Sequence, residues 1–281
     1  MNQPLILGAT GQIGQALARV WPSDAHPGLW QHRPLADLEA LKFAPGNTLS
    51  WDILEDVPPK LPVGINCMIV LAGVMGNDAV RLQDNTKIAL AAATLAQEMK
   101  ISRVLVASTQ AVYGAPDHAV KETHPCMPST AYGNAKLDME RALSDFPEVT
   151  CLRFGNVAGT DTLCRAATRQ RVVLDQFEDG KGPYRSYIGP ITLAQTLIRL
   201  LDPKLPLPKA INIANPGVVA MDDLLSAAGV CFDVKPVQGH KLRSLEMDVA
   251  QLCALVPLKR TTAQSLADEA LYAGWRPITN T

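Results

Sequence analysis

The sequence predicts an α/β fold in which helices cover both faces of a doubly wound, parallel sheet. In the first 155 residues, short apolar runs alternate with helical segments. The runs show no polar alternation, which is typical of strands covered on both faces. The chain has 281 residues, enough for one large domain with an added lobe. These observations together favour a doubly wound sheet over an open, half-exposed one.

The predicted elements follow one another regularly. Strands are expected at residues 5–7, 29–32, 48–51, 66–71, 103–107 and 149–154, and helices at 12–21, 78–99 and 132–143. After Gly155 the sequence becomes more polar, and residues 160–182 read as a surface lobe. A helix at 191–201 and a strand at 210–213 follow. We therefore expect residues 1–157, with 185–215 returning, to form the sheet domain, and residues 158–184 and 216–281 to form a small C-terminal lobe.

Composition excludes several classes of partner. The chain carries 26 basic and 27 acidic residues, so it offers no broad electrostatic surface to nucleic acid or to a membrane. Its first four residues lack the basic stretch of a signal peptide, and no apolar run approaches the ~20 residues of a membrane span. We expect a cytoplasmic protein. The six cysteines show no C-x-x-C spacing, and we expect no metal.

A glycine-rich loop directly follows the first predicted strand and opens a helix. Gly8 permits the tight turn, Gly11 lets the backbone approach a pyrophosphate, and Gly14 allows close packing of helix on strand. The free N–H groups of the helix N-terminus would hold the anion. This context predicts a dinucleotide site on a Rossmann sheet, formed by Gly8, Thr10, Gly11, Gln12, Ile13 and Gly14.

The end of the second predicted strand bears on the choice of dinucleotide. An acidic residue about 20 positions beyond the loop would bind the adenosine ribose of NAD. The chain has instead Trp30-Gln31-His32-Arg33, and Arg33 with His32 suits the 2′-phosphate of NADP. The alternative is a solvated Arg33 and NAD bound without that contact. NAD or NADP is expected, with NADP slightly favoured.

Three residues after later strands are further candidates for cofactor binding. Asp52 could accept hydrogen bonds from the adenine amino group, or cap a turn. Ala72 and Gly73 offer small side chains where a cofactor would cross the sheet edge, although small residues there also serve packing.

Tyr132 and Lys136 carry the strongest chemical signal. They are four residues apart in a predicted helix, so both project from one face. A phenol has a pKa near ~10, and a nearby ammonium favours the phenolate, so Tyr132 would exchange protons near neutral pH. Ser108 and Thr109 end the preceding strand, where a hydroxyl could bond the substrate oxygen. The interpretation as a surface pair remains the alternative for the Tyr–Lys spacing alone.

The ordered set resembles the extended short-chain dehydrogenases/reductases, in particular the NAD-dependent epimerase/dehydratase family acting on nucleotide sugars. The resemblance covers nearly the whole chain. Its matching pieces are the glycine loop, Asp52, Asn85, Ser108 to Gly114, Pro128, Tyr132 to Lys136, Arg153 to Val157, Arg185 to Ile188 and Asn212 to Asn215.

The resemblance implies a role for each matching position. Tyr132 becomes the acid/base, Lys136 its partner and a ligand of the nicotinamide ribose, and Thr109 the hydroxyl that orients the substrate. Asn85 lies near the cofactor, while Ser108, Asn156 and Arg185 contact a sugar nucleotide. From the residues alone, Arg185 could equally be a solvated loop cation. The resemblance further implies a homodimer built from the helices at 84–99 and 132–143.

Some positions depart from the family pattern. Val157-Ala158-Gly159-Thr160 replaces the usual aromatic-Gly-Pro ending, and the lobe is short. Gln110-Ala111 stands where family dehydratases have an acidic pair, which argues against dehydration. The leading hypothesis is an epimerase or reductase of a sugar nucleotide. The alternatives are an NADPH-dependent reductase of a small carbonyl compound, favoured by the short lobe and Arg33, and a non-catalytic dinucleotide sensor. The sequence leaves the sugar and the reaction direction open.

Overall fold

A seven-stranded parallel sheet forms the centre of the molecule. The computed structural model describes residues 3–22, 27–55, 57–239 and 241–279. The strand order is β11-β6-β5-β4-β1-β2-β3, and every neighbouring pair runs parallel. The predicted doubly wound sheet is thereby confirmed. Its strands are β1 (Gln3–Leu7), β2 (Gly28–His32), β3 (Gly46–Ser50), β4 (Ile65–Val70), β5 (Arg103–Thr109), β6 (Val149–Phe154) and β11 (Ala210–Ile213).

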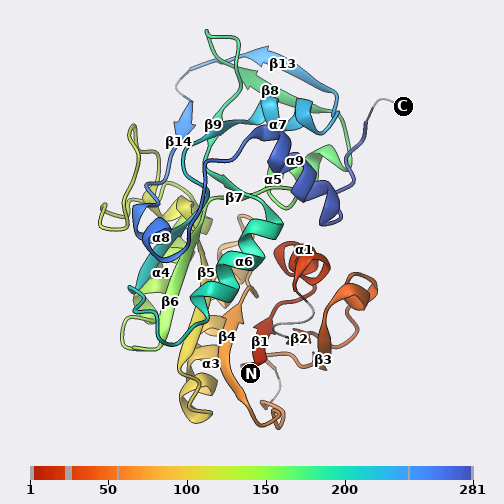
Figure 1. The fold of residues 1–281 in the computed structure, drawn as a ribbon. Helices are drawn as coiled ribbons and strands as arrows, with labels where there is room; N and C mark the ends of the chain where they lie inside the picture. The colour runs from red at the N-terminus through yellow and green to blue at the C-terminus, as the bar shows by residue number, and fades with distance from the viewer. Residues whose placement is uncertain (1–2, 23–26, 56, 240, 280–281) are drawn as a thin grey trace.

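Helices cover both faces of this sheet (Figure 1). On one face lie α1 (Gln12–Val20) and α6 (Pro190–Leu200), and on the other α3 (Asp84–Glu98) and α4 (Ala131–Ala142). Side chains alternate between the faces: Ile6 joins the first hydrophobic cluster, while Leu5 and Leu7 join the second. This two-sided burial is why the strands are apolar at every position.

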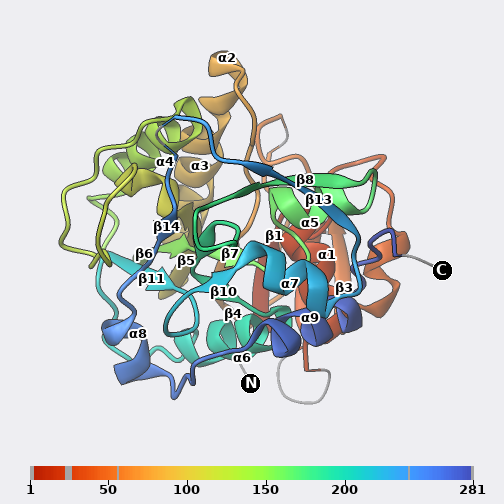
Figure 2. The same cartoon turned by 90° about the horizontal axis from the view of Figure 1, so that it is seen from above.

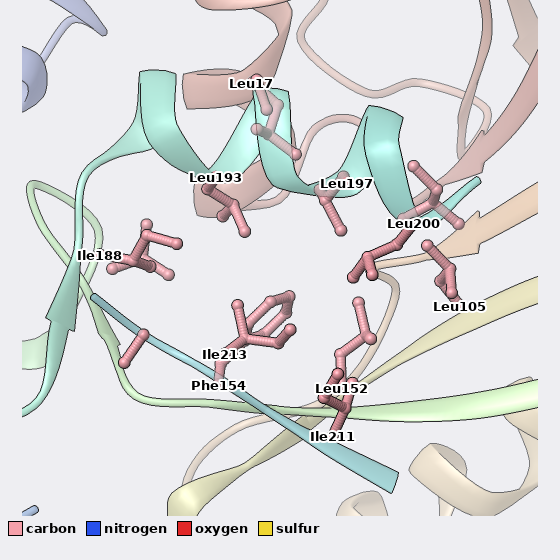
Figure 3. Close-up of a cluster of buried hydrophobic side chains, with 14 of the residues drawn as sticks. Leu17, Leu105, Leu152, Phe154, Ile188, Leu193, Leu197, Leu200, Ile211 and Ile213 are labelled. Carbon is pink, nitrogen blue, oxygen red and sulfur yellow. The ribbon is translucent and has the colours of Figure 1, made fainter. Parts of the chain in front are cut away.

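Leucines of α6 fill the space between that helix and the sheet. Figure 3 shows Leu193 and Leu197 pointing towards Leu152 and Ile213 of the strands below. All four side chains are fully buried. The helix at 190–200 therefore returns the chain to the sheet before β11 completes its edge.

The helix predicted at 78–99 is divided. Asp78 caps α2 (Ala79–Leu82), and α3 begins after Gln83. Asn85 explains the division, because its side-chain Nδ2 donates to the carbonyl of Leu82 at 3.0 Å. A side chain that bonds a helical carbonyl competes with the backbone ladder at that point.

Most of the remaining elements lie over the carboxyl ends of the strands (Figures 1 and 2), where they form a hydrophobic cluster that includes Leu224, Leu266 and Trp275. The exception is α8 (Ala250–Leu255), which packs against the edge strand β11, with Leu252 in the first cluster. The predicted division into two domains stays a prediction. No helix within the described ranges has the length and apolar character needed to cross a bilayer. These elements are β7 (Asn156–Val157), α5 (Thr162–Ala167), β8 (Val172–Gln176), β9 (Tyr184–Arg185), β10 (Tyr187–Ile188), β12 (Val219–Ala220), α7 (Met221–Ala227), β13 (Phe232–Pro236), β14 (Ser244–Leu245), α8 (Ala250–Leu255) and α9 (Ala263–Tyr272).

Candidate active site

A cleft opens where the strand order reverses. β1 lies between β2 and β4, so the chain leaves the centre in both directions, and a crevice forms beyond the carboxyl ends. Two cavities occupy it. The first, here called the β5–β6 cavity, lies at the ends of β5 and β6 and has a volume of about 460 Å³. The second, the β1–β2 cavity, lies at the ends of β1 and β2 and has a volume of about 470 Å³. They share the residues Gly11, Leu71, Gly73, Val74 and Met75, so together they form one continuous cleft.

Every residue predicted for the site lines this cleft. The β5–β6 cavity contains Gly11, Gln12, Ile13, Gly14, Gly73, Asn85, Ser108, Thr109, Tyr132, Lys136, Asn156 and Arg185. The β1–β2 cavity contains Gly8, Thr10, Gly11, His32, Arg33, Asp52, Ala72 and Gly73. The fold thus brings together residues that are up to 177 positions apart, from Gly8 to Arg185.

The three glycines of the turn have two different roles. Gly8 and Gly14 have no space for a side chain, whereas Gly11 leaves space beside the backbone for a ligand. Gly8 has a φ of +84°, and a Cβ there would lie 2.5 Å from the backbone nitrogen of Ala72. A Cβ on Gly14 would lie 2.5 Å from the carbonyl oxygen of Ala9. At Gly11 the protein offers one contact, 3.2 Å from the Gly8 oxygen. No side chain caps α1, so its first N–H groups face the opening that Gly11 leaves, and a diphosphate fits there.

Gln31 holds this turn in place, and the sequence interpretation missed it. Its Oε1 accepts from the N–H of Gly8 at 2.8 Å, and its Nε2 donates to the carbonyl of Trp51. The side chain is 3% exposed. The sequence did contain a signal for this role: a single amide side chain within an apolar strand. A buried amide requires hydrogen-bond partners, so such a residue is expected to hold neighbouring backbone groups.

Charges of both signs meet in the β1–β2 cavity. Arg33 is exposed, while the His32 ring is buried with its Nδ1 against the Arg33 carbonyl. The carboxylates of Asp52, Glu55 and Asp84 line the same cavity. Asp52 also closes a turn by accepting a backbone N–H two residues on. A 2′-phosphate bound here would therefore meet negative as well as positive groups.

Lys136 lies at the centre of the cleft. Its Nζ donates to the carbonyl of Ala107 at 2.7 Å, and the residue is 4% exposed. A Cβ on Gly73 would be 3.7 Å from this ammonium, which places it beside the end of β4. Burial lowers the pKa of Lys136 to about 8, against opposing effects of Cys151 and Glu140.

Tyr132 lies one turn earlier on the same helix. Thr130 caps α4 by accepting the N–H of Gly133 at 3.0 Å, which fixes the first turn that carries the phenol. Burial raises the pKa of Tyr132 to about 12. The sequence interpretation expected Lys136 to lower this pKa. In the protein alone the direction is the reverse, because burial removes the solvent that would stabilise the phenolate.

The two hydroxyls at the end of β5 point to different partners. Thr109 Oγ1 accepts the N–H of Ala111 at 3.2 Å, so its own proton is available to a ligand. Ser108, predicted to contact substrate, is 3% exposed and donates to Glu140 at 2.5 Å. Glu140 in turn pairs with Arg153 at 2.7 Å. Thr109 is thus the hydroxyl of the pair that faces the cavity.

Asn85 shapes the loop after β4. Its Oδ1 accepts from the N–H of Val74 at 3.1 Å, and its Nδ2 donates to the carbonyls of Val74 and Leu82. The residue is 1% exposed. These bonds occupy the amide, so its effect on a cofactor is to hold the backbone around Gly73 that lines the cleft.

Several polar atoms at the end of the β5–β6 cavity lack good hydrogen bonds. Gln110 Nε2 donates to Asn156 Oδ1 at 2.9 Å, while Gln110 Oε1 is buried and has no partner among the described residues. Asp161 Oδ1 accepts the N–H of Cys164 at 2.7 Å, and burial raises the pKa of this carboxyl. The Tyr187 hydroxyl lies near it without a well-formed bond. The sequence analysis did not predict Gln110 or Asp161 as site residues. The available signals were that Gln110 directly follows β5 and that Asp161 precedes a helical segment as a potential cap.

Arg185 brings an uncompensated charge to this cavity. Its guanidinium donates to the carbonyls of Tyr184, Leu242 and Arg243. Within the described residues it forms no ion pair with a carboxylate, and burial lowers its pKa. A half-buried guanidinium bonded only to carbonyls can still bind an anion.

Comparison with known proteins identifies the family of this chain. A family model described as the NAD dependent epimerase/dehydratase family matches residues 4–181. The chain belongs to this family. No curated protein sequence matches it. The family is of the extended short-chain dehydrogenase/reductase type, as the resemblance implied.

Solved structures share the fold over nearly the whole chain. MoeE5, solved with UDP-glucose and NAD, has a TM-score of 0.74 at 20% identity and covers 96% of this chain and 98% of its own. TunA, an NAD-dependent NDP-hexosamine 5,6-dehydratase, scores 0.74 at 19% identity, covering 98% and 99%. The UDP-glucuronic acid 4-epimerase of Bacillus cereus, solved with UDP-glucuronic acid and NAD, scores 0.76 at 18% identity, covering 96% and 98%. These neighbours do not support the slight preference for NADP.

Proposed function

We propose that this protein is an NAD-dependent epimerase or reductase of a sugar nucleotide, with Tyr132 as the acid/base. One observation carries the proposal. A phenol, a buried ammonium and a free hydroxyl, from Tyr132, Lys136 and Thr109, line the same cavity as the open N-terminus of α1. Family membership and the neighbours' ligands support the substrate class.

The proposed reaction transfers a proton and a hydride in one direction and then, for epimerisation, back. Bound NAD would supply the nicotinamide that accepts the hydride from the substrate carbinol carbon, and a positive ring. Tyr132 takes the hydroxyl proton of that carbon, while Thr109 donates to the same oxygen. Return of hydride to the opposite face of the carbonyl completes an epimerisation. Net reduction would correspond to the return step alone, with the cofactor bound as NADH and the proton supplied by Tyr132.

The electrostatics indicate what Tyr132 needs in order to act. Its pKa of about 12 must fall by roughly five units for the phenolate to form near neutrality, which corresponds to about 7 kcal/mol. A unit positive charge ~4 Å away would contribute ~4 kcal/mol of this at an effective dielectric of ~20. The positive ring of bound NAD would supply such a charge, so we expect the cofactor to favour proton transfer by Tyr132.

The substrate and cofactor assignments rest on the charges of the cleft. Arg185, bonded only to carbonyls, suits a phosphate of the sugar nucleotide. Gln110 and Ala111 supply no acid after Thr109, which favours epimerisation or reduction over dehydration. For the cofactor, the β1–β2 cavity is lined by the carboxylates of Asp52, Glu55 and Asp84 against two arginines, Arg33 and Arg81. This balance, together with the NAD bound in the neighbours, favours NAD over NADP. Calorimetric titration with both dinucleotides tests this assignment, and tighter NADP binding would overturn it.

The Tyr132→Phe variant tests the mechanism. It removes the proton donor and keeps the ring, so we expect turnover of the active sugar nucleotide to fall ~10²- to 10⁴-fold while NAD binding changes little. Tyr272→Phe is the matched control, because that tyrosine is 72% exposed. Turnover that survives in Tyr132→Phe, measured by product analysis at saturating NAD, would refute the acid/base role.

A further inference from the structure

A separate cavity lies behind the cofactor turn, between α1, α5 and α9. It has a volume of about 230 Å³ and is lined by Arg19, Arg165 and Arg276. Figures 1 and 2 show α1 next to α5 and α9 at this point. Gln12 and Thr160 line both this arginine cavity and the β5–β6 cavity, so the two adjoin.

The three guanidinium groups come from three different elements. Arg19 is in the last turn of α1, Arg165 is in α5, and Arg276 follows α9. Arg19 lies 4.4 Å from the ring centroid of Phe43, and a Cβ on Gly274 would be 2.6 Å from its Nε. Arg276 Nη1 donates to the carbonyl of Leu271 at 2.7 Å and to that of Trp275 at 2.9 Å. Arg19 and Arg276 therefore converge on the same short segment.

Among the described residues, no carboxylate compensates these charges. None of them lines the cavity with an acidic side chain, and their ion pairs include none of the three arginines. Glu269, on α9 beside the lining residue Ala270, is already bonded. Its two oxygens accept the N–H of Thr192 at 2.9 Å and its hydroxyl at 2.8 Å.

The chemistry of the cavity selects its ligand. Like charges in one cavity repel, and this repulsion is relieved when an anion binds among them. Guanidinium groups bind phosphate oxygens in a two-pronged geometry that a simple point charge cannot match. Pockets for drug-sized ligands span roughly 300–1,000 Å³, so a cavity of about 230 Å³ suits a small phosphoryl group rather than a whole dinucleotide.

We propose that the arginine cavity is a second anion site, which binds a phosphoryl group carried as free phosphate or as a small phosphate monoester. The site is distinct from the cofactor diphosphate site on the other side of α1. Gln12 and Thr160 border both cavities, so the two sites adjoin.

Titration of phosphate against the NAD-saturated protein tests this site, because saturation blocks the cofactor's own diphosphate site. Inorganic phosphate is compared with chloride at equal ionic strength, and then with a hexose 1-phosphate. We expect phosphate to raise the melting temperature where chloride does not. Tighter binding of the hexose phosphate would identify a monoester as the natural source, and equal binding would identify the free anion.

Three substitutions separate this site from others. Arg165→Gln and Arg276→Gln should each weaken phosphate binding at least about tenfold, because each removes charge-assisted hydrogen bonds. Arg141→Gln, at an arginine 67% exposed and paired with Asp138, should leave it unchanged. Arg185→Gln should also leave it unchanged, since that residue lines the other cavity.

Two results would overturn the proposal. One is the absence of any phosphate-specific shift in the natural protein. The other is a shift that persists in Arg165→Gln and Arg276→Gln but disappears in Arg185→Gln, which would assign the phosphate to the substrate side of the cleft. Both readouts are independent of turnover, so they remain informative whatever reaction the protein catalyses.

Discussion

At the scale of single residues, Lys136 shows a conflict between reactivity and stability. Its ammonium is buried, and its pKa falls from the ordinary value of 10.5 to about 8. The folded protein therefore binds this proton more weakly than the unfolded chain does. Below pH 8 the lysine is protonated in both the folded and the unfolded state, and burial of its charge lowers the free energy of unfolding by the full amount, about 3 kcal/mol. As pH rises from 8 to 10.5, the penalty disappears.

The Lys136→Met variant measures that penalty. The substitution removes the burial penalty of about 3 kcal/mol and also the hydrogen bond to the Ala107 carbonyl, which is worth ~1 kcal/mol. We therefore expect the free energy of unfolding at pH 7 to rise by about 2 kcal/mol. The gain should vanish near pH ~10 and become a loss of ~1 kcal/mol once the lysine is neutral in both states, and turnover should be lost at every pH. Urea denaturation at both pH values gives the result. Lys87→Met, at a lysine 61% exposed, is the control and should change stability by less than ~0.5 kcal/mol. A variant that is less stable than the natural protein at pH 7 would contradict the assigned penalty.

At the scale of elements, two glycines at the start of α1 have different roles, one in folding and one in binding. Gly14→Ala would press a Cβ against the carbonyl of Ala9, so we expect a loss of several kcal/mol of stability, or no folding. Gly11→Ala meets only the Gly8 oxygen at 3.2 Å and should fold with a small loss. Its added methyl fills the space proposed for the diphosphate, so NAD affinity should drop at least ~100-fold. Circular dichroism and NAD titration distinguish the two outcomes. Normal NAD binding by Gly11→Ala would place the diphosphate elsewhere.

A second element-scale feature is the buried ion pair that joins α4 to β6. Glu140 and Arg153 are each 8% exposed, and Arg153 also donates to the hydroxyl of Tyr113 at 3.0 Å. The pKa of Arg153 is raised by its bonds to Glu140, which outweigh its burial. Because Glu140 also accepts from Ser108, the pair connects the helix of Tyr132 to the strand of Thr109.

Breaking this pair from one side should be costly. Glu140→Gln leaves a buried guanidinium uncompensated, and we expect a loss of ~3–5 kcal/mol. The double variant Glu140→Met/Arg153→Met should be less destabilised than the sum of its single variants, because no charge remains buried. Arg141→Gln, on the exposed neighbouring pair, should cost less than ~1 kcal/mol. Simple additivity in the double-mutant cycle would show that the two residues do not interact.

At the scale of the whole molecule, the cleft joins the sheet to the elements above it. Gly11 comes from the sheet side and Arg185 from β9 above it, and both line the β5–β6 cavity. A ligand that spans both should stabilise the entire fold. At 100 times its dissociation constant, such a ligand adds ~2.7 kcal/mol to the free energy of unfolding.

Thermal unfolding with NAD and a series of UDP-, dTDP- and GDP-sugars tests that span. We expect one nucleotide series to raise the melting temperature above the NAD-saturated value, and Arg185→Gln to abolish this second increment while retaining the first. Arg141→Gln should retain both. If no sugar nucleotide adds stability, the substrate class proposed for Arg185 is wrong. Light scattering on the same samples checks the predicted homodimer.

Local patterns in the sequence determined most of the architecture. Two-sided burial makes strands such as β4 and β6 apolar throughout, and spacing alone puts Tyr132 and Lys136 on one helix face. The glycine turn is also local, since Gly8, Gly11 and Gly14 need only a strand before them and a helix after. A break inside the helix at Gln83 was missed because the side chain of Asn85 decides it through a hydrogen bond that no periodicity reveals.

Only the tertiary structure decided the electrostatics. Burial sets the direction of the Tyr132 pKa, and burial depends on segments far away in the chain. The partner of Ser108 is 32 residues distant, and Arg19 and Arg276, from opposite ends of the sequence, line one cavity. A sequence states which charges and hydroxyls exist; which of them lose water, and which face one another, depends on long-range packing.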